Sequence, residues 1–232
     1  MRIGLFLLLA VTLFASKEIK QRLEFGYFGT TGNTNVKSLS AGYKLTYRPS
    51  AKYKTQIKAD VYTSTRNGEK SSERIRGELD FYYYKKRDFY YYLQNGFLRN
   101  VFEGYSQQYN INPGIGLTIY KDAKNSLDTL AGYLFRRDIY TNNTNKSFNY
   151  LKGEIKYLYK LTKKNRFKLD VNYIYNIENN KDFETNLKSH MKLLISGNFS
   201  FKISFELKYD NMPVEGKKKT DTISKASIVY NF

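Results

Sequence analysis

The stretch that decides the fold lies near the end of the chain, where residues 201–209 read FKISFELKY. Apolar or aromatic residues occupy every second position, and the charged residues Lys202, Glu206 and Lys208 lie between them. Successive side chains of a β-strand point to opposite faces. The spacing therefore predicts a strand with one apolar face and one charged face.

The same alternation recurs along the chain. Phe167, Leu169 and Val171 share one face of their stretch, opposite Lys168 and Asp170. Polar, turn-forming residues separate the alternating runs, and no helical pattern of useful length is present. Several short alternating strands of this kind predict a sandwich or a barrel. We expect twelve strands, at residues 22–31, 34–48, 51–64, 71–85, 88–101, 105–120, 125–138, 147–161, 165–177, 184–195, 198–210 and 220–232.

The connections between the predicted strands alternate in character. Those after every even-numbered strand up to the tenth are tight and mostly basic, as in Lys85-Lys86-Arg87-Asp88. Most of the others are longer and polar, at residues 65–70, 139–146, 177–183 and 211–219. The connections at Gly32-Asn33 and Glu103-Gly104 are short and depart from this rule. Short periplasmic turns and long external loops are typical of bacterial outer-membrane barrels.

Two-residue alternation occurs in soluble sandwiches and in membrane barrels, so other features must decide which face meets lipid. The chain contains 23 Tyr and 16 Phe, and tyrosines near strand ends suit the aromatic girdles of a membrane interface. The long Lys, Arg and Glu side chains at mid-strand suit a wet, ion-paired lumen. We therefore expect an all-β protein, a single antiparallel up-and-down transmembrane β-barrel of about 12 strands.

The N-terminus has the layout of a secretory signal peptide. Arg2 precedes an apolar run over residues 3–15, and charged residues follow from Lys17. The run is shorter than the roughly 20 residues that a membrane-spanning helix needs. We expect cleavage after Ala15 or Ser16, which removes residues 1–16 and leaves the barrel in residues 17–232. The expected location is the outer membrane of a Gram-negative-type bacterium.

Charge and cysteine content narrow the function classes. The formal net charge is +18 and the chain has no cysteine. The bases alternate with apolar residues and do not cluster, so the charge predicts one solvated sheet face and no nucleic-acid partner. The absence of cysteine excludes thiolate metal sites, and it suits passage through an oxidising periplasm.

The last predicted strand, residues 220–232, ends on an aromatic residue, and residues 226–232 have apolar residues at alternate positions before it. This ending is similar to the signal that the barrel-assembly machinery recognises, with Ile228, Tyr230 and Phe232 as the recognised residues. If these face lipid, the neighbouring strand presents Ile203 outward and Ser204 inward. We expect Ile203→Lys to block assembly, Ser204→Lys to be tolerated, and deletion of Phe232 to lower the outer-membrane yield.

Nearly the whole chain after residue 22 resembles the domain-of-unknown-function family 481, a group described as salt-induced outer-membrane proteins. The resemblance implies location and fold, and it brings no catalytic residues. Its motifs are made of strand and turn residues, and the glycine and asparagine of the first motif suit a tight hairpin because both tolerate positive φ. These motifs are Gly26-Tyr27-Phe28-Gly29-Thr30-Thr31-Gly32-Asn33-Thr34-Asn35, Ser72-Glu73-Arg74, Asn112-Pro113-Gly114-Ile115-Gly116, Tyr209-Asp210-Asn211-Met212-Pro213, Lys219-Thr220-Asp221 and Val229-Tyr230-Asn231-Phe232.

Catalytic and metal sites find little support in the sequence. His190 is the only histidine, and its spacing from Lys188 and Lys192 places it on the charged face. An outer-membrane lipid-modifying enzyme would need its histidine on the lipid-facing side, so that reading is the third alternative. One histidine without cysteine does not make a common zinc site. No cofactor is expected.

The charged face is predicted to line the lumen. The inward bases and the histidine are Lys44, Lys54, Lys58, Arg74, Arg76, Lys152, Lys156, Lys160, Lys168, Lys188, His190, Lys192, Lys202 and Lys208. The opposing acids are Glu24, Asp60, Glu78, Asp80, Glu154, Asp170 and Glu206. An excess of Lys and Arg in a pore favours anions, whereas complete pairing of the charges would close the lumen.

Two functions follow from these alternatives. An open lumen predicts a small passive channel that prefers anions. A filled lumen predicts a closed structural or envelope-stress barrel whose loops and basic rim contact lipopolysaccharide phosphates. Outer-membrane lipid and lipopolysaccharide are expected partners in either case, and small anions are partners of an open lumen.

Overall fold

The structure is a computed structural model that describes residues 18–30 and 35–232. All twelve predicted strands are present, and the largest difference in a boundary is three residues, at the start of β1. A 3-10 helix, η1 (Val101–Glu103), joins β5 and β6. The strands are β1 (Ile19–Thr30), β2 (Val36–Tyr47), β3 (Tyr53–Arg66), β4 (Glu69–Tyr84), β5 (Phe89–Asn100), β6 (Tyr105–Lys121), β7 (Asn125–Tyr140), β8 (Asn145–Lys160), β9 (Arg166–Asn176), β10 (Phe183–Ser196), β11 (Phe199–Asp210) and β12 (Thr220–Asn231).

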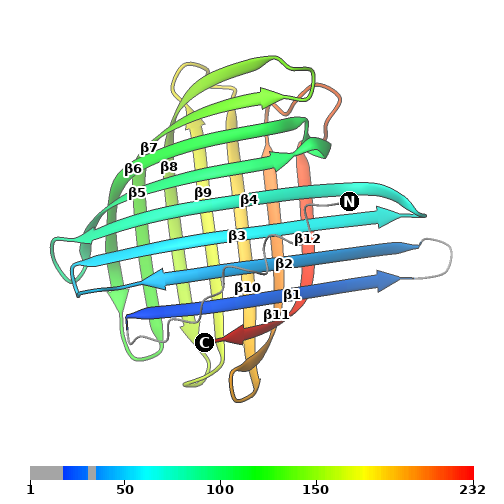
Figure 1. The fold of residues 1–232 in the computed structure, drawn as a ribbon. Coiled ribbons are helices and arrows are strands. Elements are labelled where there is room, and N and C mark those ends of the chain that lie inside the picture. Colours follow the sequence, from blue (N-terminus) through cyan, green and yellow to red (C-terminus); the bar gives the residue numbers. More distant parts are fainter. Residues whose placement is uncertain (1–17, 31–34) are drawn as a thin grey trace.

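The strands form one closed barrel (Figure 1). Each strand pairs antiparallel with its neighbours in the chain, and β12 closes the sheet against β1. The predicted fold, an antiparallel up-and-down barrel of 12 strands, is confirmed. Among the described residues, no helix is long and apolar enough to cross a membrane.

The barrel has two ends, which we name by their connections. The turn end holds the start of β1, the end of β12 and the connections at residues 48–52, 85–88, 122–124, 161–165 and 197–198. The loop end holds the other connections, of which residues 177–182 and 211–219 are the longest among the described residues.

The loops are shorter than the sequence predicts. The connection expected over residues 65–70 is a two-residue turn of Asn67 and Gly68, with φ of 52° and 88°. Both residues tolerate positive φ, so the flanking strands can pair right up to the turn. The predicted hairpin at Gly32-Asn33 and the predicted signal peptide lie outside the described residues.

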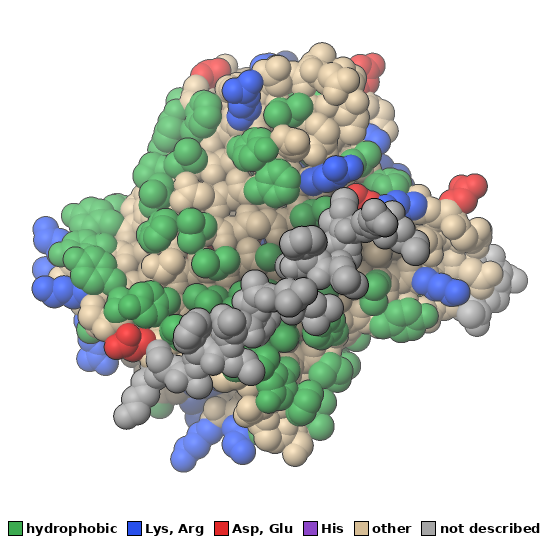
Figure 2. Space-filling view, viewed as in Figure 1, with side chains coloured by type: hydrophobic (Ala, Val, Ile, Leu, Met, Phe, Trp, Pro, Cys, Tyr) green, Lys and Arg blue, Asp and Glu red, His purple; other side chains and the backbone are tan. Residues whose placement is uncertain are grey.

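The two faces of the wall differ as the alternation predicts. Outward apolar side chains are well exposed, with Phe25 at 59 %, Leu151 at 55 % and Ile203 at 53 %. Inward residues such as Ser200 and Val229 are buried. Figure 2 shows apolar side chains along the wall, with charged side chains mainly toward the ends. A wall of this kind suits a hydrocarbon environment.

Part of the interior is filled by aromatic packing that the sequence did not predict. Tyr82, Tyr90, Tyr92 and Leu130 form a buried cluster on the inner face of β4, β5 and β7. A second cluster contains Leu134, Tyr150 and Ile174 on β7, β8 and β9. The space left for solute is therefore narrower than the backbone barrel.

The seam that closes the barrel is short. The register of β1 with β12 runs from Arg22↔Asn231 to Gly26↔Ser227, near the turn end. The backbone N–H of Phe232 donates to the carbonyl of Gln21 at 3.1 Å. A row of aromatic rings lies beside it, with Phe199 and Tyr230 centred 4.8 Å apart and Tyr230 and Phe232 4.7 Å apart.

We expect Phe232→Ala to lower the yield of folded protein in the outer membrane. The change removes one ring of this row, and such ring pairs contribute about 0.5–1.5 kcal/mol beyond their buried area. The measurement is the heat-modifiable folded fraction in outer-membrane preparations. Leu161→Ala, an apolar truncation at the turn end away from the seam, is the control, and equal loss in both variants would contradict a special role for the seam.

Candidate functional site

The inner face of the barrel surrounds a cavity of about 620 Å³. Its lining includes Arg87 and Lys121 at the turn end and Glu103 and Asp221 at the loop end. The cavity thus runs along the barrel axis.

Most of the residues predicted to face the lumen line this cavity. They are Lys44, Lys54, Lys58, Arg74, Arg76, Lys152, Lys156, Lys168, Lys188 and Lys208. Lysines and arginines outnumber acids in the lining, at fourteen to nine. The basic excess expected for the lumen is therefore present along the cavity itself.

Four predicted residues lie elsewhere. Lys202 faces inward but is held by Glu24, with Nζ to Oε2 at 2.6 Å. His190 and Lys192 belong to the packed inner wall of β10 and do not line the cavity. Lys160 is exposed at the end of β8, where it donates to the carbonyl of Ala123 at 3.1 Å.

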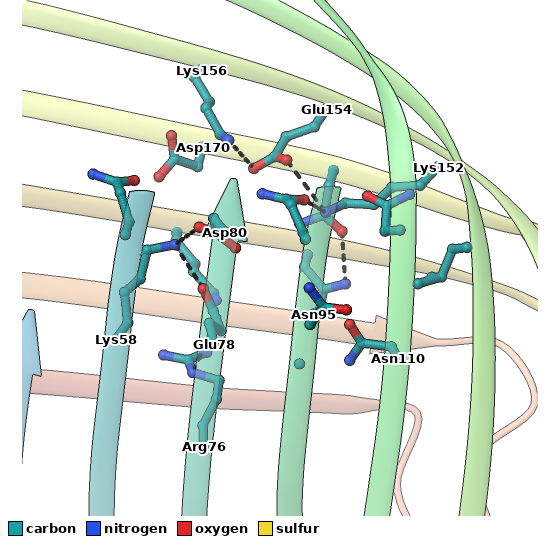
Figure 3. A pocket seen from close by; sticks show the side chains of 18 of the residues that line it. Lys58, Arg76, Glu78, Asp80, Asn95, Asn110, Lys152, Glu154, Lys156 and Asp170 are labelled. Carbon is teal, nitrogen blue, oxygen red and sulfur yellow. Dashed lines mark hydrogen bonds and ion pairs between the residues drawn. The ribbon is translucent and has the colours of Figure 1, made fainter. Parts of the chain in front are cut away.

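The wall made by β3 and β4 holds a dense ion-pair network. Lys58 Nζ lies 2.7 Å from Glu78 Oε2 and 2.8 Å from Asp80 Oδ2. Arg76 donates to Asp60 from Nε at 2.8 Å and also from Nη2. Figure 3 shows Lys58, Glu78 and Asp80 together at the cavity. The charges of Lys58 and Arg76 are therefore well compensated.

The wall made by β8 and β9 has fewer acids for its bases. Glu154 is shared, with its carboxylate oxygens 3.4 Å from Lys152 Nζ and 3.3 Å from Lys156 Nζ (Figure 3). Lys168 pairs with Asp170. A single carboxylate that serves two ammonium groups leaves part of the positive charge on this wall uncompensated.

An ion pair crosses the middle of the lumen. Arg74 of β4 donates from Nη1 to Glu206 Oε2 of β11 at 3.0 Å. In the barrel, four strands separate β4 from β11 on one side and six on the other. Lys225 also binds Glu206, at 2.9 Å. This strut narrows the path near the middle of the barrel.

The loop end is narrowed by η1. Glu103 lies in this helix, and its Oε2 is 3.1 Å from Lys208 Nζ of β11. Gly104 ends the helix with φ of 96°, and a Cβ there would lie 2.8 Å from the side chain of Val214. The short connection at residues 103–104 therefore folds inward against the connection between β11 and β12.

Sequence reasoning missed the Arg136 cluster near the loop end. Arg136 is buried, pairs with Glu184 and donates to the hydroxyl of Tyr150 at 2.5 Å. Tyr150 in turn donates to Asp182 at 3.2 Å. Apolar residues occupy both faces of β7, so its alternation did not reveal which face turned inward. An arginine and an aspartate at alternate positions, Arg136 and Asp138, were the available signal.

The described part of the chain contains no organised group of side chains suited to catalysis or to metal binding. His190 lies opposite Lys168 on β9 and Ser204 on β11, on the inner face of the barrel. No set of three or more His, Cys, Asp or Glu residues in the described ranges could hold a metal ion. The organised features are the charged cavity and its cross-lumen pairs.

Comparison with solved structures shows the same fold in outer-membrane proteins. The COG4313 outer-membrane channel from Pseudomonas putida F1 aligns with a TM-score of 0.57 at 6 % identity, over 92 % of this chain and 95 % of that chain. The NanC porin aligns with a TM-score of 0.51 at 10 % identity, over 92 % and 97 %. The translocator domain of the autotransporter NalP from Neisseria meningitidis aligns with a TM-score of 0.52 at 8 % identity, over 94 % and 89 %.

The comparison with curated proteins found no significant match. The model of one protein family matches residues 23–232, which is nearly the whole barrel. That family is described as a protein of unknown function, DUF481. The resemblance noted in the sequence motifs is confirmed, and the chain belongs to the DUF481 family.

Proposed function

We propose that this protein is a passive channel of the outer membrane of a Gram-negative-type bacterium, for small solutes and with a preference for anions. The observation that carries the proposal is the cavity, which is lined by residues from both ends of the barrel and by more bases than acids. Basic side chains along a pore raise the local concentration of anions and lower that of cations.

The narrowness of the path limits the solute. The buried clusters around Tyr92 and Tyr150 fill part of the lumen, so the remaining path suits small ions and excludes folded cargo. The Arg74–Glu206 strut and the Glu103–Lys208 pair narrow it further. The channel role also agrees with two proteins of the same fold, whose names describe an outer-membrane channel and a porin.

Planar-bilayer recordings in a potassium chloride gradient test this function. We expect a small conductance whose reversal potential lies on the chloride side, because the lining charge is basic. Lys156→Glu, which reverses a charge at the cavity, is expected to shift the reversal potential toward that of potassium. Lys160→Glu on the same strand has an exposed side chain and should shift it little. Silence at all voltages, or cation preference in the unchanged protein, would refute the proposal.

A closed structural barrel is the second candidate, and two observations favour it. Ion pairs cross the lumen at Arg74–Glu206 and Lys208–Glu103. The loop between β11 and β12 carries three consecutive exposed lysines, Lys217, Lys218 and Lys219, which suit the phosphates of lipopolysaccharide. Deletion strains with unchanged tolerance to salt and detergent would count against this role.

A further inference from the structure

The uncompensated bases of the cavity gather toward the turn end. Lys44 and Lys54 lie near the turn-end limits of β2 and β3, and both line the cavity. Among the residues that the structure describes, neither forms an ion pair. Lys58, further along β3, has two carboxylates within 2.8 Å. The positive charge of Lys58 is therefore compensated by carboxylates, whereas the charges of Lys44 and Lys54 are not.

The neighbours of Lys44 increase its positive field. Its register partners are Arg22 on β1 and Lys58 on β3. The strongest charged influences on Lys44 come from basic groups alone, those of Lys58, Arg22, Lys168 and Lys54. An ammonium in such surroundings, largely removed from bulk water, has a high free energy unless an anion joins it.

Lys54 is positioned by an aromatic ring and faces a further lysine. Its Nζ lies 3.5 Å from the centre of the Tyr82 ring, which is a favourable cation–π distance. Lys156 and Arg48 are the strongest basic influences on Lys54. Lys156 has only a share in Glu154. Lys156 also has Asp128 and Asp170 as its register partners, so the ammonium groups without an ion pair in this part of the cavity include those of Lys44 and Lys54.

We propose that this half of the lumen holds a saturable site for a small, doubly charged oxyanion, bound by Lys44 and Lys54. The ligand class comprises hydrogen phosphate, sulfate and short dicarboxylates. Two uncompensated ammonium groups match two negative charges, and each ammonium offers three donors to the several acceptor oxygens of such an ion. The site rests on the proposed function, because it is the place where an anion would bind on its way through the anion-preferring channel.

Calorimetric titration of the folded barrel in detergent micelles with inorganic phosphate at pH 7 and low salt tests the site without requiring conduction. We expect saturable binding that weakens about tenfold in Lys44→Gln and in Lys54→Gln, because each loses a charge-assisted hydrogen bond. Lys44→Arg keeps the charge and should keep most of the affinity. Lys160→Gln, whose side chain is exposed and lies outside the cavity lining, is the control and should bind as the unchanged protein does. Parallel titrations with sulfate and succinate rank the members of the class.

Phosphate added to the bilayer recordings separates this site from the channel proposal. We expect it to reduce the chloride current of the unchanged protein and to have little effect on the Lys44→Gln/Lys54→Gln variant. A barrel that binds phosphate through these lysines but passes no chloride would refute the channel and support the site. Anion conduction with no saturable phosphate binding, or binding that falls equally in Lys160→Gln, would overturn the site and leave the channel standing.

Discussion

Ile203→Lys is expected to prevent stable insertion of the barrel. Ile203 lies in the middle of β11 on the outer face and is 53 % exposed, so in the membrane its side chain would meet lipid. A lysine at the bilayer midplane costs about 2–4 kcal/mol in a transmembrane barrel. The measurement is the free energy of unfolding in lipid vesicles, together with the folded fraction in outer-membrane preparations.

The best control is Ile223→Lys on the neighbouring strand. Ile223 faces the lumen, lines the cavity and pairs with Glu206 in the register of β11 and β12. The same substitution there places an ammonium group beside a carboxylate in a hydrated lumen. We therefore expect only a small change in the free energy of unfolding. Equal destabilisation of the two variants would show that the assigned faces are wrong.

The structure also refines the control that the sequence suggests. Ser204 lies on the inner face, as its phase predicts, but it is only 7 % exposed. Its register partners are His190 on β10 and Lys225 on β12. A lysine at this position would be crowded and would face a like charge, so Ser204→Lys is a poorer test than Ile223→Lys.

The fold was predictable because the side chains of a strand alternate between two faces. Only one question then remains for each strand, namely which of its two faces turns inward. Where one face is clearly apolar and the other charged, as in β9 and β11, the inward face follows from the sequence. The same reasoning placed Lys44, Lys58 and Lys156 in the lumen. It fails where both faces carry the same kind of residue, as in β7, and Arg136 was missed for that reason.

Contacts between residues of the site that are distant in the chain could not be predicted from a single sequence. The Arg74–Glu206 pair joins residues 132 positions apart, and nothing in either strand indicates which charges meet across the lumen. Tyrosine suits both faces of a membrane barrel because it has an apolar ring and a polar hydroxyl. The runs at residues 82–84 and 90–92 therefore show no alternation, although Tyr82, Tyr90 and Tyr92 point inward and fill part of the lumen.

The inward tyrosines of β5 depend on glycines in the adjacent strand, β6. A Cβ built on Gly114 would lie 2.4 Å from the carbonyl oxygen of Ala131 and 2.4 Å from the hydroxyl of Tyr92. A Cβ on Gly116 would lie 2.3 Å from the ring of Tyr90. The Asn112-Pro113-Gly114-Ile115-Gly116 motif of the family thus has a packing role, because it makes room on β6 for two rings from β5.

Gly114→Ala is therefore expected to destabilise the barrel by about 1–3 kcal/mol, the usual cost of overpacking. The clash includes a backbone oxygen, which cannot move without disturbing the pairing of β6 with β7. Gly77→Ala is the matched control, since nothing lies within 4 Å of its Cβ position, and alanine should be neutral or slightly stabilising there. Urea unfolding in vesicles measures both variants. For Gly116→Ala, where the three nearest atoms all belong to the side chain of Tyr90, a second change of Tyr90→Leu should recover part of the loss. Equal midpoints for Gly114→Ala and Gly77→Ala would refute the packing role of the motif.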